Sequence, residues 1–257
     1  MVESTRILIY NPNSSKSITD GLKSILDPIK DAGIELEYRS GPSSAPESIN
    51  DAPTSIQSAQ AGYEYLVGGG DAKGAAASLA SQFSAILVCC FSDHPLVNML
   101  RHTLPANVSV MHLLETGLLA GLTSSRGRPI GIITTGQDMV RDIDAGVAAF
   151  FGSSAKANDR YAGCLATGLG VLQLRDPSQK KFVQHAIRAK AATLAKSGVG
   201  AVMLGCAGMA GMEEIVRKGL ADHLGEQQAN QIAIIDTAKA GLHLLTAQIR
   251  LNKEFLP

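Results

Sequence analysis

Short apolar runs alternate along this chain with longer segments in which apolar residues recur at helical spacing. The sequence predicts strands at residues 6–10, 35–39, 85–90, 108–113, 129–134, 201–205 and 231–236, with a weaker one at 170–174. The helical spacing predicts helices at residues 17–32, 55–82 and 180–196. Strands that alternate with helices in this way are typical of a parallel α/β architecture.

The second half of the chain repeats landmarks of the first half. One apolar run ends at Cys90 and another ends at Cys206, and residues 110–121 resemble residues 232–243. Each cysteine stands where the chain should leave a strand and turn toward a helix. We therefore predict two similar α/β lobes that face each other.

The repeat suggests a first lobe at residues 1–114 and a second lobe at residues 115–236, with residues 237–257 packing back on the first. Residues 41–53 are rich in serine, proline and glycine and predict an ordered loop, and Gly68-Gly69-Gly70 predicts a helix break. Open α/β sheets bind ligands beyond the carboxyl ends of their strands. We therefore expect a site in the cleft between the lobes.

Composition and charge narrow the classes of function. The chain has 257 residues, 45% of them hydrophobic, and its 23 basic and 23 acidic residues give no net charge. No basic block marks a nucleic-acid binder, and no apolar run reaches membrane-spanning length. The four cysteines and an N-terminus without secretory features lead us to expect reduced thiols in a cytoplasmic protein. We also expect a homo-oligomer.

The two matching cysteines suggest proton transfer. A thiol at a helix N-terminus faces unpaired N–H groups and the positive end of the helix dipole, which lowers its pKa. One thiolate can then take a proton from a carbon next to a carbonyl, and a thiol on the opposite face can return one. No metal or organic cofactor is expected, because the cysteines lack zinc-ligand spacing and no phosphate-binding motif is present. The alternative is that Cys90 and Cys206 are small buried side chains of the core.

Four short segments together resemble the hydantoin racemase branch of the aspartate/glutamate racemase superfamily: residues 11–15, 90–93, 115–117 and 204–209. The resemblance covers nearly the whole chain. It implies two pseudosymmetric Rossmann-like lobes and cofactor-independent racemisation at C5 of a 5-substituted hydantoin or allantoin, with Cys90 and Cys206 as the acid/base pair. Bacterial members tend to have small residues where this chain has His94-Pro95-Leu96, which leaves the substrate open.

Residues in the strand-end loops are expected to contact the substrate: Asn13, Ser14, Gly41, Pro42, Phe91, Thr134, Thr135, Gly205, Ala207 and Gly208. The alternative for Asn13 and Ser14 is that they cap the next helix. For the two threonines it is simple turn chemistry, and for Gly41-Pro42 it is a plain turn. Cys89 should point to the face of its strand opposite Cys90, and we expect Cys89 and Cys164 to be structural. His112 is expected in the core, and a substrate contact of His94 is left open.

Other activities in the superfamily remain as alternatives. An amino-acid racemase should hold an α-carboxylate with a cation, whereas the strand-end loops named above contain no arginine or lysine. Decarboxylases that resemble this family typically keep one of the two cysteines, and a cis–trans isomerase is a further possibility. A homologue that binds ligand without turnover is the alternative from another class. The two intact cysteines favour a racemase of an uncharged ring.

Overall fold

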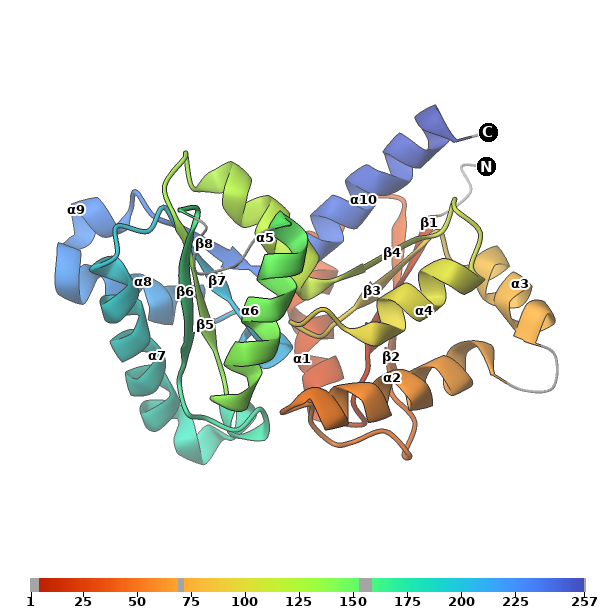
Figure 1. The fold of residues 1–257 in the computed structure, drawn as a ribbon, viewed down its shortest axis with the longest axis horizontal. Coiled ribbons are helices and arrows are strands. Elements are labelled where there is room, and N and C mark those ends of the chain that lie inside the picture. The colour runs from red at the N-terminus through yellow and green to blue at the C-terminus, as the bar shows by residue number, and fades with distance from the viewer. Residues whose placement is uncertain (1–4, 69–71, 153–158, 257) are drawn as a thin grey trace.

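The computed structural model describes residues 5–68, 72–152 and 159–256. Within these residues the strands form two four-stranded parallel sheets, ordered β2-β1-β3-β4 and β6-β5-β7-β8 (Figure 1). The first sheet contains β1 (Thr5–Asn11), β2 (Ile34–Ser40), β3 (Ala85–Val88) and β4 (Ser109–His112). The second contains β5 (Ile130–Thr134), β6 (Tyr161–Ala166), β7 (Ala201–Leu204) and β8 (Ala233–Asp236). Because the strand order is the same in both sheets, the predicted fold of two similar α/β lobes is confirmed.

Helices cover both faces of each sheet. The α-helices are α1 (Lys16–Leu26), α2 (Ala52–Val67), α3 (Ala72–Gln82), α4 (Pro95–Thr103), α5 (Leu113–Ser124), α6 (Asp138–Phe151), α7 (Lys180–Ala195), α8 (Glu213–Leu224), α9 (Glu226–Ala229) and α10 (Thr237–Phe255). Short 3₁₀ helices are η1 (Asp27–Ile29), η3 (Leu172–Arg175), η4 (Pro177–Gln179) and η5 (Ala207–Met209). None of the helices in the described ranges has the length and apolar character that crossing a membrane requires.

The central strands are buried on both faces. Ile7, Leu8, Ile9 and Tyr10 of β1 are all fully buried. Alternate residues of this strand join different apolar clusters, Ile7 and Ile9 on one face and Leu8 and Tyr10 on the other. The continuous apolar runs of the sequence are therefore the signature of parallel strands with helices on both sides.

One predicted strand is wrong and one strand was missed. Residues 170–174 were expected to form a strand, but Leu172–Arg175 is the 3₁₀ helix η3. The strand beside β5 is β6, Tyr161–Ala166, an edge strand with glycine, alanine and cysteine in place of β-branched residues. The expected helix break is found, because α2 ends at Val67 and α3 begins at Ala72; Gly69 and Gly70 lie outside the described residues.

Two helices, α5 and α10, each pack against strands of both lobes. Helix α5 follows β4 but also packs against β7 and β8, and α10 follows β8 but packs against β3 and β4 (Figure 1). A glycine permits each close approach: a Cβ at Gly241 would lie 2.8 Å from Leu87, and one at Gly121 would lie 3.2 Å from the sulfur of Met203. The carboxyl ends of the two sheets are thus held against a shared apolar core.

Candidate active site

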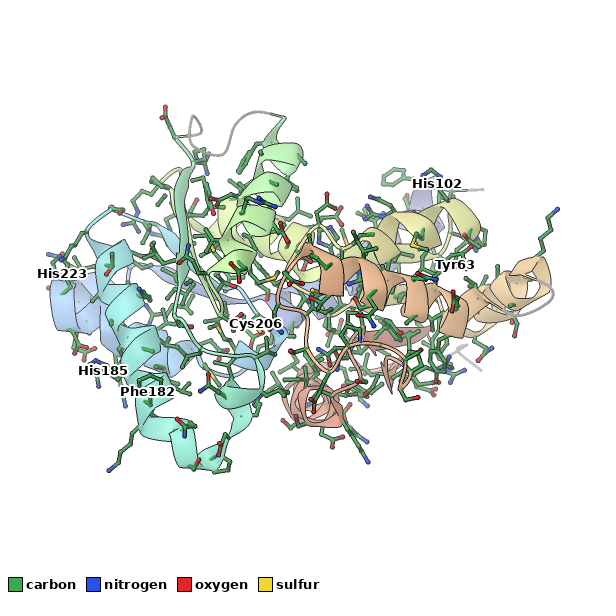
Figure 2. All side chains as sticks on the ribbon, turned by 60° about the horizontal axis from the view of Figure 1, so that its bottom comes forward. Tyr63, His102, Phe182, His185, Cys206 and His223 are labelled. Atoms are coloured by element: carbon green, nitrogen blue, oxygen red, sulfur yellow. The ribbon has the colours of Figure 1, made fainter. Side chains whose placement is uncertain are left out.

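Both cysteines lie just beyond the carboxyl end of a central strand. The N–H of Cys89 donates to Tyr10 O of β1 at 2.7 Å, and the N–H of Gly205 donates to Ile133 O of β5 at 2.8 Å. The residue before each of the two cysteines is therefore hydrogen-bonded to the neighbouring strand. Cys90 and Cys206 line the same cavity, and Figure 2 shows Cys206 where the two lobes meet.

The cavity gathers nine of the residues predicted for the site. They are Asn13, Cys90, Phe91, Thr134, Thr135, Gly205, Cys206, Ala207 and Gly208. The remaining lining residues were not predicted there: Ile18, Ile49, Cys89, Met139 and Val171. All lining side chains are uncharged. The cavity volume is about 30 Å³, whereas pockets for small ligands span roughly 300–1,000 Å³. A ligand therefore requires the walls to move apart.

Ser14, Gly41 and Pro42 do not line this cavity. The N–H of Gly41 donates to Asn13 O at 2.9 Å and to Asn11 O at 2.7 Å. Gly41 therefore stabilises the loop that carries Asn13. A Cβ at Gly41 would come within 2.7 Å of Pro12 O, which explains the glycine. The N–H of Ser14 donates to Pro46 O, and Pro42 O accepts from Ala45 in a turn.

Cys89 packs in the apolar core on the same face of β3 as Ala85 and Leu87, whereas Ile86 and Val88 pack on the opposite face. Strand β3 ends at Val88, and the N–H of Cys90 donates to Val88 O at 2.9 Å. Cys89 lines the cavity while its thiol, 2% exposed, donates to Leu87 O at 3.7 Å. Cys164 lies in β6, is buried, and is absent from the cavity wall.

The asparagine loop presents a defined donor. Asn13 Oδ1 accepts from Asn11 Nδ2 at 2.9 Å and from the N–H of Ser15 at 3.0 Å. These two bonds fix which end of the Asn13 amide is oxygen. Asn13 Nδ2 has no hydrogen-bond partner within the described part of the chain, so this N–H₂ group is available at the cavity wall.

The second lobe contributes two threonines. Thr134 Oγ1 donates to Gly205 O at 2.9 Å, which links β5 to the turn before Cys206. The hydroxyl of Thr167 donates to Thr134 O and to Thr135 O and fixes the backbone of this loop. Thr134 therefore positions the cysteine turn, and both threonines line the cavity.

Burial controls the ionisation of both thiols. It raises the pKa of Cys90 to about 12 and that of Cys206 to about 11. The Ser92 hydroxyl, 3.3 Å from Cys90 Sγ, partly opposes the rise of the Cys90 pKa. We expected a helix N-terminus to lower the pKa of each thiol, and this is wrong for both. Desolvation outweighs the backbone N–H donors at Cys206, and helix α4 begins only at Pro95, beyond Cys90.

Backbone donors surround Cys206. Its Sγ accepts the N–H of Gly208 at 3.4 Å, as the N-cap of η5. Within the described residues, the N–H groups of Cys206 and Ala207 donate to no acceptor. Unpaired N–H groups beside a reactive group can stabilise an oxyanion.

The two histidines have structural partners outside the cavity. His94 is fully buried, its Nδ1 accepts the N–H of Leu96, and its Nε2 lies 2.8 Å from Ser58 Oγ. Burial lowers the pKa of His94 to about 3. His112 is buried as expected; it caps α5 and pairs with Asp93, lowering the pKa of that carboxyl. Neither histidine lines the cysteine cavity.

Known proteins resemble this chain over nearly its full length. The Asp/Glu/hydantoin racemase family model matches residues 7–245. An uncharacterised protein of Schizosaccharomyces pombe is 31% identical over 249 residues, which are 96% of this chain and 93% of the relative. Allantoin racemase from Klebsiella pneumoniae has a similar structure, with a TM-score of 0.77 at 20% identity over 97% of this chain and 89% of that one. Glutamate racemase from Francisella tularensis gives 0.59 at 15% identity, over 98% and 83%.

Proposed function

This chain belongs to the Asp/Glu/hydantoin racemase family, and we propose that it inverts C5 of a hydantoin-type ring, a 5-substituted hydantoin or allantoin. The reaction is a proton transfer between Cys90 and Cys206 that needs no cofactor. The observation that carries this proposal is the cavity that both cysteines line at the carboxyl ends of the two sheets. The similarity in fold to an allantoin racemase supports it.

The chemistry requires one thiolate and one thiol. The thiolate takes the C5 proton, and the electron pair moves into the adjacent carbonyl to give an enolate. The opposite thiol then gives its proton to C5 on the other face, which inverts the centre and exchanges the two protonation states. The free N–H groups of Cys206 and Ala207 and the Nδ2 of Asn13 are the donors available to ring oxygens.

The walls of the cavity favour an uncharged ring. None of the lining residues is charged, and Ile18, Ile49, Phe91, Met139 and Val171 give it an apolar surface. An amino acid would bury its α-carboxylate there without a cation, and an unpaired buried charge costs several kcal/mol, on the order of 3–5. A hydantoin ring instead presents carbonyls and N–H groups that neutral donors and acceptors can satisfy.

Hydrogen exchange at C5 tests the proposal. Purified protein is incubated with each pure enantiomer of allantoin and of 5-methylhydantoin in D₂O, and NMR follows loss of the C5 proton while polarimetry follows racemisation. We expect Cys90→Ala and Cys206→Ala to lose racemisation by at least ~100-fold, the contribution of a general acid or base. Cys164→Ala, a buried cysteine away from the cavity, is the matched control and should turn over normally.

Serine variants assign the faces. Serine leaves a proton donor but a far weaker acid than the thiol. Cys90→Ser and Cys206→Ser should therefore each exchange the C5 proton of one enantiomer only, and of opposite enantiomers. A folded alanine variant with near wild-type racemisation would contradict the two-cysteine reaction. Equal exchange of both enantiomers by both serine variants would indicate a single base.

A further inference from the structure

A second hollow, called the outer hollow below, adjoins the cysteine cavity. Its volume is about 310 Å³, at the lower end of the range for small-ligand pockets, roughly 300–1,000 Å³. Met139 lines both spaces. Ser92 lines the outer hollow, and its Oγ lies 3.3 Å from Cys90 Sγ. The outer hollow therefore shares a wall with the cavity that contains the two thiols.

Both lobes contribute to the outer hollow. Helix α2 of the first lobe and helix α6 of the second each present one face to it, where the two lobes meet (Figure 1). Residues three and four positions apart share a helix face, and the lining residues follow this spacing: Ala52, Ser55 and Ile56 on α2, and Met139, Asp142 and Gly146 on α6. A Cβ at Gly146 would lie 3.2 Å from Asp93 Cβ, so α6 packs closely against the turn after Cys90.

Met139 separates the two spaces. The cysteine cavity measures only about 30 Å³, so a bound ring needs its walls to move and its substituent needs further room. Methionine is unbranched, has three rotatable bonds and adapts its shape more readily than other core residues. A change of the Met139 rotamer therefore removes part of the shared wall and opens the cavity toward the outer hollow.

The outer hollow is acidic, unlike the cysteine cavity. Asp93 and Asp142 line it, and none of its lining residues is an arginine or a lysine. Asp93 Oδ1 lies 3.5 Å from His112 Nε2, and the nearby Arg101 is paired with Glu115. Asp142 forms no ion pair or hydrogen bond within the described residues. An unpaired carboxylate attracts N–H donors and cations and repels another carboxylate.

We propose that the outer hollow binds the C5 substituent of the substrate, and that Met139 and Asp142 determine which substituents are accepted. The inference rests on the proposed function, because it names a substrate class within the hydantoins. The ring lies between the two cysteines, and the substituent extends past Met139 to the space between α2 and α6. Substituents with N–H donors or a positive charge are accepted there, such as a ureido, amide or ammonium group, and carboxylates are rejected.

Matched hydantoins test the selection by charge. Polarimetry gives kcat/KM, and isothermal titration calorimetry gives Kd, for the hydantoins derived from alanine, glutamine, glutamate and ornithine. The glutamine and glutamate substituents have nearly the same size and differ in charge. The wild-type protein should prefer the glutamine hydantoin to the glutamate hydantoin by at least ~5-fold, the upper effect of a partly exposed charge pair. This preference should shrink in high salt, because salt screens exposed charges.

Variants on α6 assign the residues. Asp142→Asn should raise the glutamate-to-glutamine ratio of kcat/KM by ~3-fold or more. Asp222→Asn removes the same charge from the outer helix α8 and is the matched control, with an unchanged ratio. Ala145→Trp fills the outer hollow from an exposed helix position, so it should fold and should lower the ornithine-to-alanine ratio by ~10-fold. Met139→Ala widens the opening and should raise that ratio.

Two results overturn the inference: a glutamate-to-glutamine ratio that Asp142→Asn leaves unchanged, or an ornithine-to-alanine ratio that Ala145→Trp leaves unchanged. Calorimetry separates these results from failure of the proposed function. Binding in the expected order without racemisation contradicts the function and not the role of the outer hollow. Racemisation that does not depend on the substituent contradicts the role of the outer hollow alone, and the absence of both binding and racemisation refutes both.

Discussion

Replacing Thr134 with valine removes one hydrogen bond from the turn that carries Cys206. Thr134 is 1% exposed, and its Oγ1 donates to Gly205 O at 2.9 Å. Within the described residues, Gly205 O accepts no other hydrogen bond. Valine has nearly the same shape, so the change tests the bond more than the packing. The residue directly after Gly205 is the proposed acid/base group.

The expected loss of stability follows from the burial of the Gly205 carbonyl, which Thr134→Val leaves without a hydrogen-bond donor. A buried acceptor that loses its partner costs about 1–3 kcal/mol. For a chain of this size, each kcal/mol lowers the melting temperature by roughly 2–4 °C. A displacement of about 1 Å in a reacting group can cost ~100-fold in rate. We therefore expect Thr134→Val to fold with a modestly lower melting temperature and to lose at least ~10-fold in racemisation.

Thr237→Val supplies a matched control. Thr237 is also 1% exposed, and its Oγ1 donates at 2.9 Å to the O of Leu204, the residue before Gly205, yet it does not line the cavity. Thermal unfolding and polarimetry should show a similar fall in melting temperature for both variants but a fall in activity for Thr134→Val alone. Equal activities in the two folded variants would refute the positioning role of Thr134, and Thr134→Ser should restore turnover.

Two further predictions concern pH and metals. Burial lowers the pKa of His94 to about 3, whereas in the unfolded chain the imidazole takes up a proton near pH 6.5. The free energy of unfolding should therefore fall by about 1.4 kcal/mol per pH unit as the pH falls from about 6.5 toward 3. Melting temperatures measured between pH 4 and 7 should therefore fall less steeply for His94→Gln, and identical slopes would contradict this. No group of three or more potential metal ligands was found among the described residues, so racemisation should survive EDTA and dialysis; activity lost to chelation and restored by a metal would oppose that expectation.

The buried strands and the matching cysteines were predictable because they depend on local sequence. Residues 7–10 and 85–90 are continuous apolar runs, and each central strand needs such a run because both its faces are covered. The two cysteines were recognisable because the same strand-end pattern occurs twice. Both features depend on only a few neighbouring residues.

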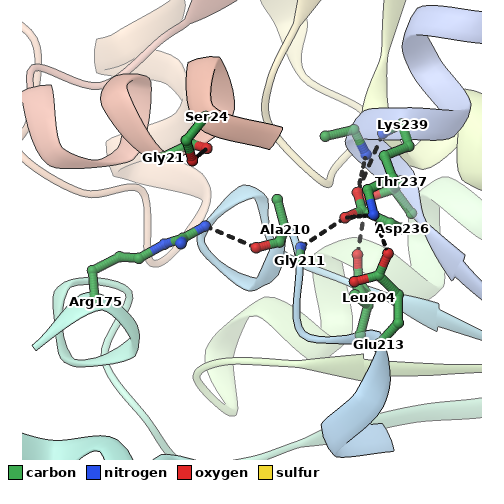
Figure 3. A network of polar contacts seen from close by, with 11 residues as sticks. Gly21, Ser24, Arg175, Leu204, Ala210, Gly211, Glu213, Asp236, Thr237 and Lys239 are labelled. Atoms are coloured by element: carbon green, nitrogen blue, oxygen red, sulfur yellow. Dashed lines mark hydrogen bonds and ion pairs between the residues drawn. The ribbon is translucent and has the colours of Figure 1, made fainter. Parts of the chain in front are cut away.

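The rest of the site depends on contacts between distant segments. Ile49 and Val171 reach the cavity from loops whose sequence has no reactive residue to mark them. Arg175 precedes Ala210 by many positions and follows a segment expected to be a strand, so its hydrogen bond to Ala210 O (Figure 3), in the turn that follows Cys206, could not be inferred.

Duplication explains why the thiols occupy matching positions, but a two-base racemase needs them in opposite protonation states. A symmetric pair would have no built-in preference for which thiol holds the proton at rest. The halves differ immediately after each cysteine: η5 turns the N–H of Gly208 toward Cys206 Sγ, whereas Cys90 has the Ser92 hydroxyl and no helix until Pro95. Under the proposed function, the two thiols therefore act with unlike hydrogen-bond partners, and helices α5 and α10, which pack against both sheets, hold the two turns against one cavity.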